Sequence, residues 1–399
     1  MATTDVKRNV RMLMGLIFAL SSTQPGFSQT APSLVTKSWA LVGTYGIDAR
    51  KAWSQLRGSC ASVTVAVIDT GVDFSHPDLK NSAWINTKEL NGKPNHDDDG
   101  NGFNDDIYGY DFVEKTGKVS VDEHGHGSHI AGIIAADSKD GSGIKGVCPG
   151  AKIMSLRYHG PKVTGPQALE YTVNAIHYAI KNGAKIINYS GGGRYYSGEE
   201  FAAMKAAEAA GVLVVAAAGN ETSNVDQEEN RYYPASYGLT NIISVGGIDS
   251  TGSKVRSSNW GSHSVDIAAP GKEILSTTST RKGLYEMLTG TSQATAFVSG
   301  VAALIYAQNS NLKFNDVRDI IVNSGKKTKT LAGMVKQSSR LSAASALESA
   351  KKRQVIARKS AKPAKRVAKK KPDLERSTAT WQNHRNQTPQ SQIHPALNQ

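Results

Sequence analysis

Short apolar runs rich in Val and Ile recur along the chain without alternating with polar residues. They are Val63–Ile68, Lys152–Leu156, Ala184–Asn188, Val212–Ala218 and Ile242–Val245. Strands of this kind are buried on both faces, as in a parallel sheet covered by helices. The pattern therefore predicts a parallel sheet at the centre of the fold.

Longer segments with helical patterns separate these runs. They cover Gly127–Ala136, Gly165–Asn182 and Gly198–Ala210, and an Ala- and Val-rich segment covers 292–308. Strands that alternate with helices of this length are typical of α/β folds. We expect a single domain with a doubly wound, mostly parallel sheet and helices on both faces.

The two ends of the chain depart from this pattern. Residues 1–30 start with basic residues, continue with nine apolar residues at Met12–Leu20 and end in small residues, which is the pattern of a secretory signal peptide. A helix of nine residues spans ~14 Å, too short for a ~30 Å hydrocarbon core. A buried core helix is the alternative. We predict a signal peptide at 1–30, a folded domain at 31–350, a disordered tail at 351–399, and a secreted or periplasmic location.

The net charge of +13 is concentrated in the tail. Residues 351–371 hold 11 Lys and Arg and no acid, and the rest of the chain has 36 basic and 34 acidic residues. Such a segment attracts polyanions without sequence preference; a solubilising tail without a partner is the alternative. Because the tail lacks interleaved aromatic residues, nucleic-acid binding is disfavoured as the main function.

Three motifs lie at predicted strand–helix junctions. Asp69-Thr70-Gly71 follows the first strand, HGHGSHIAG (124–132) opens a helix, and GTSQA (290–294) opens the last predicted helix. Each motif alone has another interpretation: the first is typical of a turn, the second of a metal-binding histidine cluster and the third of a helix cap. Together they supply the carboxylate, imidazole and hydroxyl that acyl transfer by serine requires.

In their order along the chain, these motifs resemble the subtilase family of serine endopeptidases. The resemblance covers residues 39–310 and includes VIDTG (67–71), VVAAAGN (214–220) and GTSQATAFVSG (290–300). It implies hydrolysis of protein or peptide substrates by a monomeric enzyme without a catalytic cofactor. An inactive subtilase-fold binding protein is the alternative.

The resemblance also implies a role for each matching residue. Ser292 is the expected nucleophile, His126 its general base and Asp69 the carboxylate that orients the base, whereas His129 is expected to be structural. Asn220 is the expected side-chain donor of the oxyanion hole. The expected substrate-binding residues form two segments: Ser190, Gly191 and Gly192, and Ala217, Ala218 and Gly219. Gly191 stands where the family usually has Leu, which predicts a wider cleft.

An acidic loop lies between Asp69 and His126. Its oxygen-bearing residues begin with the spacing of a calcium loop, but Tyr108 stands where that loop ends in a bidentate Glu. A solvated loop without an ion is the alternative. The predicted calcium ligands are Asp97, Asp99, Asn101, Asp105 and Asp106.

The chain has two cysteines, Cys60 and Cys148. Cys60 lies three residues before the strand that starts at Val63, and Cys148 lies three residues before a strand start near Ala151. In the subtilase fold these two strands resemble parallel neighbours. Neighbouring strands are ~4.8 Å apart, which suits the ~4.4–6.8 Å between the Cα atoms of a disulfide. We predict a disulfide bond in an exported protein; two separate buried thiols are the alternative.

Overall fold

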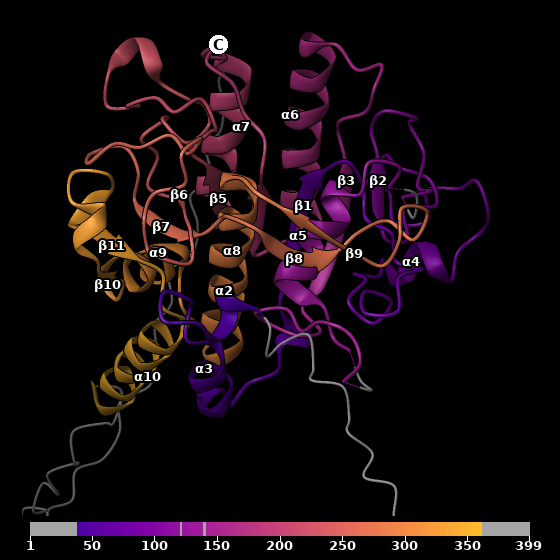
Figure 1. Ribbon diagram of the computed structural model, residues 1–399. Coiled ribbons are helices and arrows are strands. Elements are labelled where there is room, and N and C mark those ends of the chain that lie inside the picture. The colour runs from indigo at the N-terminus through magenta and orange to yellow at the C-terminus, as the bar shows by residue number, and fades with distance from the viewer. Residues whose placement is uncertain (1–37, 120–121, 139–140, 361–399) are drawn as a thin grey trace, which may run out of the picture. The chain divides into compact units, whose positions relative to one another are not determined.

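The computed structural model describes residues 38–360 except 120–121 and 139–140 (Figure 1). The predicted signal segment 1–30 lies outside the described residues, as does 361–399. One compact unit ends at Val355. Within the described ranges, no helix combines the length and the apolar character needed to cross a bilayer.

A parallel sheet forms the centre of the molecule. Its order in the described residues is β10-β11-β7-β6-β5-β4-β1-β3-β2, and only β10 and β11 pair antiparallel. The antiparallel strands β8 and β9 form a separate hairpin sheet. The bounds are β1 (Thr64–Asp69), β2 (Gly109–Asp111), β3 (Lys152–Arg157), β4 (Ile186–Tyr189), β5 (Leu213–Ala217), β6 (Ile242–Ile248), β7 (Ile267–Pro270), β8 (Ile274–Thr277), β9 (Tyr285–Leu288), β10 (Lys326–Lys327) and β11 (Ser339–Arg340).

Helices cover both faces of this sheet (Figure 1). The α-helices are α2 (Trp39–Val42), α3 (Ala49–Gln55), α4 (Thr87–Leu90), α5 (His126–Ala135), α6 (Gly165–Lys181), α7 (Gly198–Ala209), α8 (Thr291–Gln308), α9 (Phe314–Asn323) and α10 (Ala343–Ser360). Short 3₁₀ helices lie at Cys60–Ser62, Glu228–Asn230, Lys329–Leu331 and Lys336–Ser338.

Alternate residues of the strands enter two separate cores. In β1, Val65 and Val67 pack with α5 and α8, whereas Ala66 and Ile68 pack with α6 and α7 on the opposite face. Burial on both faces explains the continuous apolar runs in the sequence. The predicted α/β fold is confirmed, and β1, β3, β4, β5 and β6 lie at the predicted runs. The three-residue β2 and the four-residue β7 were not predicted.

The strand order reverses at β1. The chain passes from β1 to β3 on one side, and β4 to β7 continue on the other side. In open α/β sheets, ligands bind where the order reverses, beyond the carboxyl ends of the strands. The segments that follow β1 and β4, at Asp69 and at Ser190–Gly192, therefore meet at this edge.

The predicted disulfide is confirmed. Cys60 and Cys148 are bonded, with 5.6 Å between their Cα atoms. Thr64 of β1 pairs with Lys152 of β3, an offset of 88 residues that equals the separation of the two cysteines. The cysteines therefore lie side by side at the amino end of the sheet because the register places them there.

The predicted start of the disordered tail at residue 351 is wrong. Helix α10 continues through 351–360 and ends at Ser360. Ala, Lys, Arg and Gln are strong helix formers, so a charged segment can extend a helix without contributing to the core. Of the basic segment 351–371, only the part up to Ser360 belongs to the described residues.

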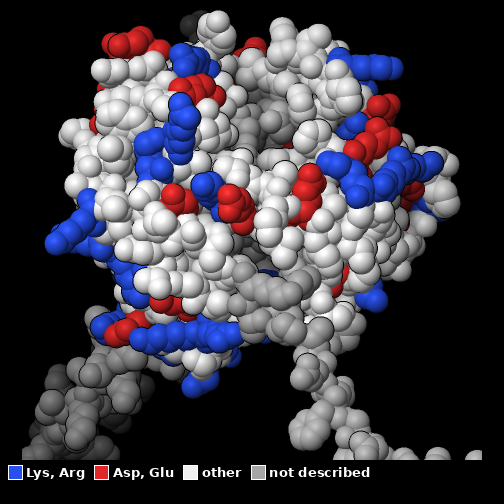
Figure 2. All heavy atoms as spheres, viewed as in Figure 1, with Lys and Arg blue, Asp and Glu red and all other residues white. Residues whose placement is uncertain are grey.

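Charges of both signs are interspersed on the face shown in Figure 2. Lys and Arg alternate there with Asp and Glu over the described residues. Mixed charges do not build the one-signed field that steers a polyanion. This face therefore does not favour the nucleic-acid alternative.

Candidate active site

A hydrogen bond joins the end of β1 to the start of α5. Asp69 is the last residue of β1, and its Oδ1 lies 2.7 Å from Nδ1 of His126, the first residue of α5. The side chain of Asp69 is 5% exposed and that of His126 is 23% exposed. The carboxylate therefore orients the imidazole through Nδ1, and Nε2 on the other edge of the ring can exchange a proton with a substrate or a nucleophile.

Asp122 holds the start of α5 in place, a role that sequence reasoning missed. This buried carboxylate accepts hydrogen bonds from the backbone of Gly125 (2.8 Å) and Ser128 (2.9 Å) and from the Thr70 hydroxyl (2.9 Å). The Thr70 hydroxyl in turn accepts from the Gly127 backbone at 3.0 Å. The only sequence signal was an acid just before HGHG, the position at which an acid favours a helix N-terminus.

The surroundings of His126 change its basicity. Burial lowers the pKa of the imidazole, but the charge and hydrogen bond of Asp69 and the charge of Asp122 outweigh it. The net pKa of His126 therefore lies above its ordinary value. Both carboxylates stabilise the imidazolium that forms when His126 takes up a proton.

Ser292 lies at the amino end of α8. It is the second residue of the helix, after Thr291, and it is 8% exposed. The backbone N–H groups of a helix's first turn lack partners within the helix and carry its positive end. Among the described residues, the carbonyl of Ser190 accepts the hydrogen bond of the Ser292 hydroxyl, at 3.1 Å.

A buried polar network joins Ser292 to the segment after β4. Ser299 of α8 donates to the side-chain oxygen of Asn188 at 2.8 Å, and the amide of Asn188 donates to Ser190 at 3.0 Å. The Ser190 hydroxyl then donates to the Ser292 carbonyl at 3.3 Å. Asn188 and Ser299 were not predicted as site residues, although polar residues inside an apolar strand and helix were a visible signal.

Asn220 follows β5 and lies beside the start of α8. Its side-chain oxygen accepts from the backbone N–H of Thr291 at 3.0 Å and from the Thr291 hydroxyl at 3.3 Å. Because the carbonyl end is engaged, the Nδ2 amide is the end that can donate to a ligand. Asn220 itself is exposed.

His129 is a structural residue, as expected. Its Nε2 lies 3.0 Å from the carbonyl of Ile274 and 3.1 Å from that of Glu286, so this nitrogen carries the proton. Burial and the nearby charge of His126 lower the pKa of His129 to about 4. The neutral ring therefore ties α5 to the β8–β9 hairpin.

Two tyrosine side chains lie beside Gly191, where a wider cleft was expected. A Cβ placed on Gly191 would lie 2.2 Å from the hydroxyl of Tyr158 and 2.9 Å from Cε2 of Tyr189. The volume that a side chain would occupy at this position is already filled by two tyrosines. Gly191 is needed because the neighbouring rings are large.

Only two of the predicted calcium ligands, Asp97 and Asp99, belong to a cluster of carboxylates in the described residues. Carboxylate oxygens of Glu89, Asp97 and Asp99 lie within 4.8 Å of one another. Glu89 comes from α4 and was not predicted, because it precedes the loop and belongs to no spacing pattern. Asp105 and Asp106 lie outside this cluster of three: Asp105 accepts from the Asn95 backbone at 2.9 Å.

Asp106 and Asn101 support the loop from inside. Asp106 is fully buried and accepts hydrogen bonds from Tyr178, Asn101 (2.7 Å) and Asn86 (3.2 Å). Burial, with the charges of Asp99 and Glu89, raises the pKa of Asp106 to about 6. The side-chain oxygen of Asn101 accepts a hydrogen bond from the backbone N–H of Phe103 at 2.8 Å.

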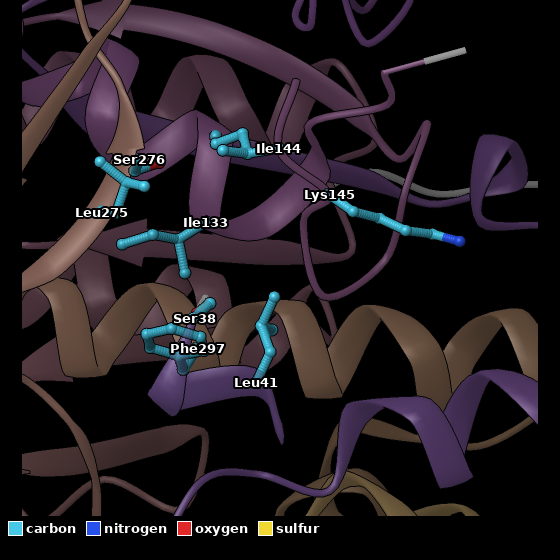
Figure 3. Close-up of a pocket in the computed structure, with 9 residues that line it drawn as sticks. Ser38, Leu41, Ile133, Ile144, Lys145, Leu275, Ser276 and Phe297 are labelled. Carbon is cyan, nitrogen blue, oxygen red and sulfur yellow. The ribbon is translucent and has the colours of Figure 1, made fainter. Parts of the chain in front are cut away.

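Two cavities differ in what they can accept. The cavity in Figure 3 has a volume of about 20 Å³, room for one water molecule, and its lining includes Leu41, Ile133 and Phe297. A second cavity, of about 680 Å³, opens beside Gly192 and Gly193, and five tyrosines are among its lining residues. Only the second has the size of a ligand site.

The chain matches proteins of one family over most of its length. The model of the subtilase family matches residues 61–345. The chain is 39% identical over 260 residues to the "Major intracellular serine protease" of Bacillus subtilis, covering 65% of this chain and 72% of that protein. It is 34% identical over 281 residues to "Subtilisin-like protease 1" of Plasmodium berghei, covering 67% of this chain and 46% of that protein.

A solved structure gives the same result. The crystal structure of a cold adapted subtilisin-like serine proteinase superimposes with a TM-score of 0.58 at 26% identity, covering 72% of this chain and 91% of that chain. The chain spans about half the length of the Plasmodium berghei relative.

Proposed function

Because this chain belongs to the subtilase family, we propose that it is a serine endopeptidase that forms its acyl-enzyme on Ser292. The 2.7 Å contact between Asp69 and His126 carries the proposal. It lies at the edge of the sheet where the strand order reverses, and α5 packs against the helix that begins with Thr291 and Ser292.

The proposed reaction uses His126 first as a base and then as an acid in each of its two stages. The Ser292 hydroxyl turns from the Ser190 carbonyl towards His126, transfers its proton to the imidazole and attacks the scissile carbonyl. Asp69 holds the imidazolium through Nδ1. His126 then protonates the leaving amine, and a water molecule hydrolyses the acyl-enzyme in the same way.

Two donors are proposed for the oxyanion of the tetrahedral intermediate. They are the Nδ2 amide of Asn220 and the backbone N–H of Ser292 at the positive end of α8. Thr291 supports the first donor because it binds the opposite end of the Asn220 amide. Donors fixed in advance require no reorganisation when the charge develops.

The alternative of an inactive binding protein makes a different prediction. A fluorophosphonate reacts with a serine only when a base activates it and an oxyanion site accepts the developing charge. We expect the purified protein to be labelled at Ser292, as read by peptide mass spectrometry. No labelling at Ser292 would favour the binding-protein alternative.

The raised pKa of His126 predicts where activity is lost in acid. The base must be neutral, so kcat/KM falls as the pH drops through the pKa of His126. We expect the midpoint of this acid limb to lie above the ordinary histidine pKa of about 6.5. Asp122→Asn removes one charge that raises this pKa and should move the limb to lower pH.

Glu123→Gln is the matched control for this measurement. Glu123 is the exposed neighbour of Asp122 and pairs with Arg281 at 3.3 Å. We expect this variant to keep the wild-type profile. The role of Asp122 in raising the pKa of His126 would be contradicted if the midpoint of the acid limb of kcat/KM did not move in Asp122→Asn. It would also be contradicted if the midpoint moved equally in both variants.

We propose that the acidic loop binds a structural calcium ion. The donor set fits, because three carboxylates within 4.8 Å of one another offer the oxygen ligands that calcium prefers. Hydrogen bonds from the backbone of Gly102 and Asn101 lower the pKa of Asp97 and keep it anionic. Glu89, Asp97 and Asp99 would hold the ion, which would offset their mutual repulsion.

Chelation is therefore expected to lower the unfolding temperature. A ligand at 100 times its Kd stabilises the folded state by ~2.7 kcal/mol. We expect calcium to restore the melting curve after EDTA treatment, Glu89→Gln to abolish this response, and Asp105→Asn to retain it. Identical curves with EDTA and with calcium would mean that the loop is solvated without an ion.

We propose an extracytoplasmic location, with the folded domain following a signal peptide at 1–30. Disulfides persist in oxidising compartments, so the Cys60–Cys148 bond supports export. Two relatives are named as intracellular proteases, from Bacillus subtilis and Paenibacillus polymyxa. The location of these relatives therefore does not predict that of this chain.

We further propose a monomer whose basic segment 351–371 contacts polyanions. Its 11 basic residues without an acid support the proposal. On heparin in low salt, the full chain should elute later than residues 1–350, and the difference should vanish in high salt. Elution of both at the same low salt concentration would reject the contact.

A further inference from the structure

A polar cavity lies at the amino ends of β6 and β7, whereas Asp69 lies at the carboxyl end of β1. Its lining includes Ile242, the first residue of β6, and Asp266, the residue before β7. The cavity has a volume of about 160 Å³. This volume is too small for a drug-sized organic ligand, but it has room for a small ion or several water molecules.

Two cationic side chains meet on one buried carboxylate in this cavity. Oδ1 of Asp266 accepts hydrogen bonds from Nη2 of Arg318 at 2.8 Å and from Nζ of Lys336 at 2.9 Å. Oδ2 of Asp266 accepts from the backbone N–H of Ser244 at 2.9 Å. Because both oxygens already accept hydrogen bonds, a metal cation at Asp266 would have to displace these donors.

The charges in the cavity sum to one excess positive charge. Arg318 and Lys336 are cationic, and Asp266 is the only acid among the lining residues that the structure describes. The side chains of Arg318 and Lys336 are 24% and 38% exposed. Because partly buried charges are screened less than charges in open solvent, this excess charge attracts a small anion.

Hydrogen-bond donors remain for such an anion. Arg318 donates from Nε to a backbone carbonyl at 3.1 Å and from Nη2 to the carboxylate, so Nη1 has no protein partner among the described residues. The ammonium of Lys336 has three donors and uses one on the carboxylate. Ser236 and Ser264, which also line the cavity, carry hydroxyl groups. Guanidinium, ammonium and hydroxyl groups are donors that bind phosphate.

The fold holds both cations in position. Arg318 belongs to α9, whose apolar residues are buried. The backbone N–H of Lys336 donates to the carbonyl of Val265 at 2.8 Å, which ties the loop of Lys336 to the residue before Asp266. Donors that are fixed before binding lose less conformational freedom when a ligand arrives.

We propose that this cavity binds a small oxyanion, phosphate or sulfate, between Arg318 and Lys336. The anion accepts hydrogen bonds from both cations and neutralises the charge that Asp266 leaves uncompensated. This site is independent of the proposed peptidase activity, and its charge is opposite to that of the acidic loop.

Titration calorimetry of the full chain with inorganic phosphate tests the site. At about 0.15 M ionic strength, charges more than ~8 Å apart are largely screened. We expect saturable binding of phosphate to the wild type. Lys336→Met should weaken this binding by at least ~10-fold, because it removes a hydrogen bond between two charged groups. Absence of saturable binding to the wild type would overturn the proposal.

Lys326→Met is the matched control. Lys326 also pairs with a carboxylate, that of Asp48, at 2.8 Å, and its side chain is 44% exposed, but it does not line the cavity. We expect this variant to bind phosphate as the wild type does. The basic segment 351–371 is the same in all three proteins, so its contacts with phosphate cancel in the comparison. Equal binding by Lys336→Met and Lys326→Met would reject the cavity as the site.

Two further measurements define the ligand and exclude a folding defect. Sulfate should compete with phosphate, and tighter binding of glycerol 3-phosphate than of phosphate would reject a free anion as the ligand. Lys336→Met should melt at the wild-type temperature in buffer without either anion, because Arg318 still pairs with Asp266. Arg318→Gln gives a second test at the other cation and should weaken phosphate binding by a similar factor.

Discussion

Ser292→Ala is expected to lower kcat/KM for a peptide substrate by at least ~10⁴-fold. The variant lacks the only atom that forms the proposed acyl-enzyme, and neither His126 nor Asn220 can replace a nucleophile. The residual rate would come from binding and from the oxyanion donors. Initial rates on casein or a peptide p-nitroanilide, with enzyme concentration set by absorbance, give this comparison.

The fold should survive this change. The Ser292 hydroxyl makes one hydrogen bond, to the Ser190 carbonyl, and a bond of this kind contributes about 1 kcal/mol to stability. Thr295→Ala is the matched control: it removes a hydroxyl from α8 one turn later, which donates to the Thr291 carbonyl at 2.8 Å. The control should retain most of the activity. Undiminished turnover by Ser292→Ala would reject the nucleophile assignment.

Loss of the Cys60–Cys148 bond is expected to produce the largest change in stability. The bond closes 88 residues of chain, and in the chain-entropy model such a loop contributes ~4–5 kcal/mol to the free energy of unfolding. For a domain of this size, this is a fall of Tm on the order of 10 °C. Calorimetry of the oxidised protein, the reduced protein and a double Cys→Ala variant gives the comparison.

Activity at low temperature should remain after reduction. The cysteines lie before β1 and β3, whereas Asp69 ends β1. The strand alone separates the two ends by ~16 Å. A reduced protein that loses activity and stability together at low temperature would show that the bond also shapes the site.

The same bond tests the proposed location. We expect protein recovered outside the cytoplasm to carry no alkylation label under denaturing, non-reducing conditions, and a variant without residues 1–30 to stay inside the cell. Two labels on exported protein would exclude the disulfide, and unchanged export of the truncated variant would exclude the signal peptide.

Much of the candidate site could be predicted because short motifs carry the resemblance to the family. Asp69 ends a predicted strand and His126 opens a predicted helix, whereas the role of Asn220 was implied by the resemblance alone. Helix α8 was also predicted, because the Ala- and Val-rich segment begins at Ser292. The disulfide was predicted from similar offsets before two strands that the resemblance to the family makes parallel neighbours, and the register of β1 and β3 agrees with it.

The remaining contacts depend on the paths of loops between elements. Glu89 joins the acidic cluster from α4, Asp122 anchors α5 from an adjoining loop, and Tyr158 fills the space beside Gly191. No spacing in the sequence relates these residues to their partners. Their side chains make these contacts because loops that are far apart in the sequence lie close together in the fold.

The sequence by itself therefore determined the layers of the fold, the family and the residues proposed for catalysis, because burial on both sheet faces and short glycine-rich motifs are local properties. Only the tertiary structure decided which side chains from distant segments pack together. Tyr232 lies 12 residues from Asn220 and 40 from Gly192 along the chain, yet a Cβ placed on Gly192 or on Gly219 would meet its ring. Such contacts depend on the close packing of segments that are far apart in the sequence.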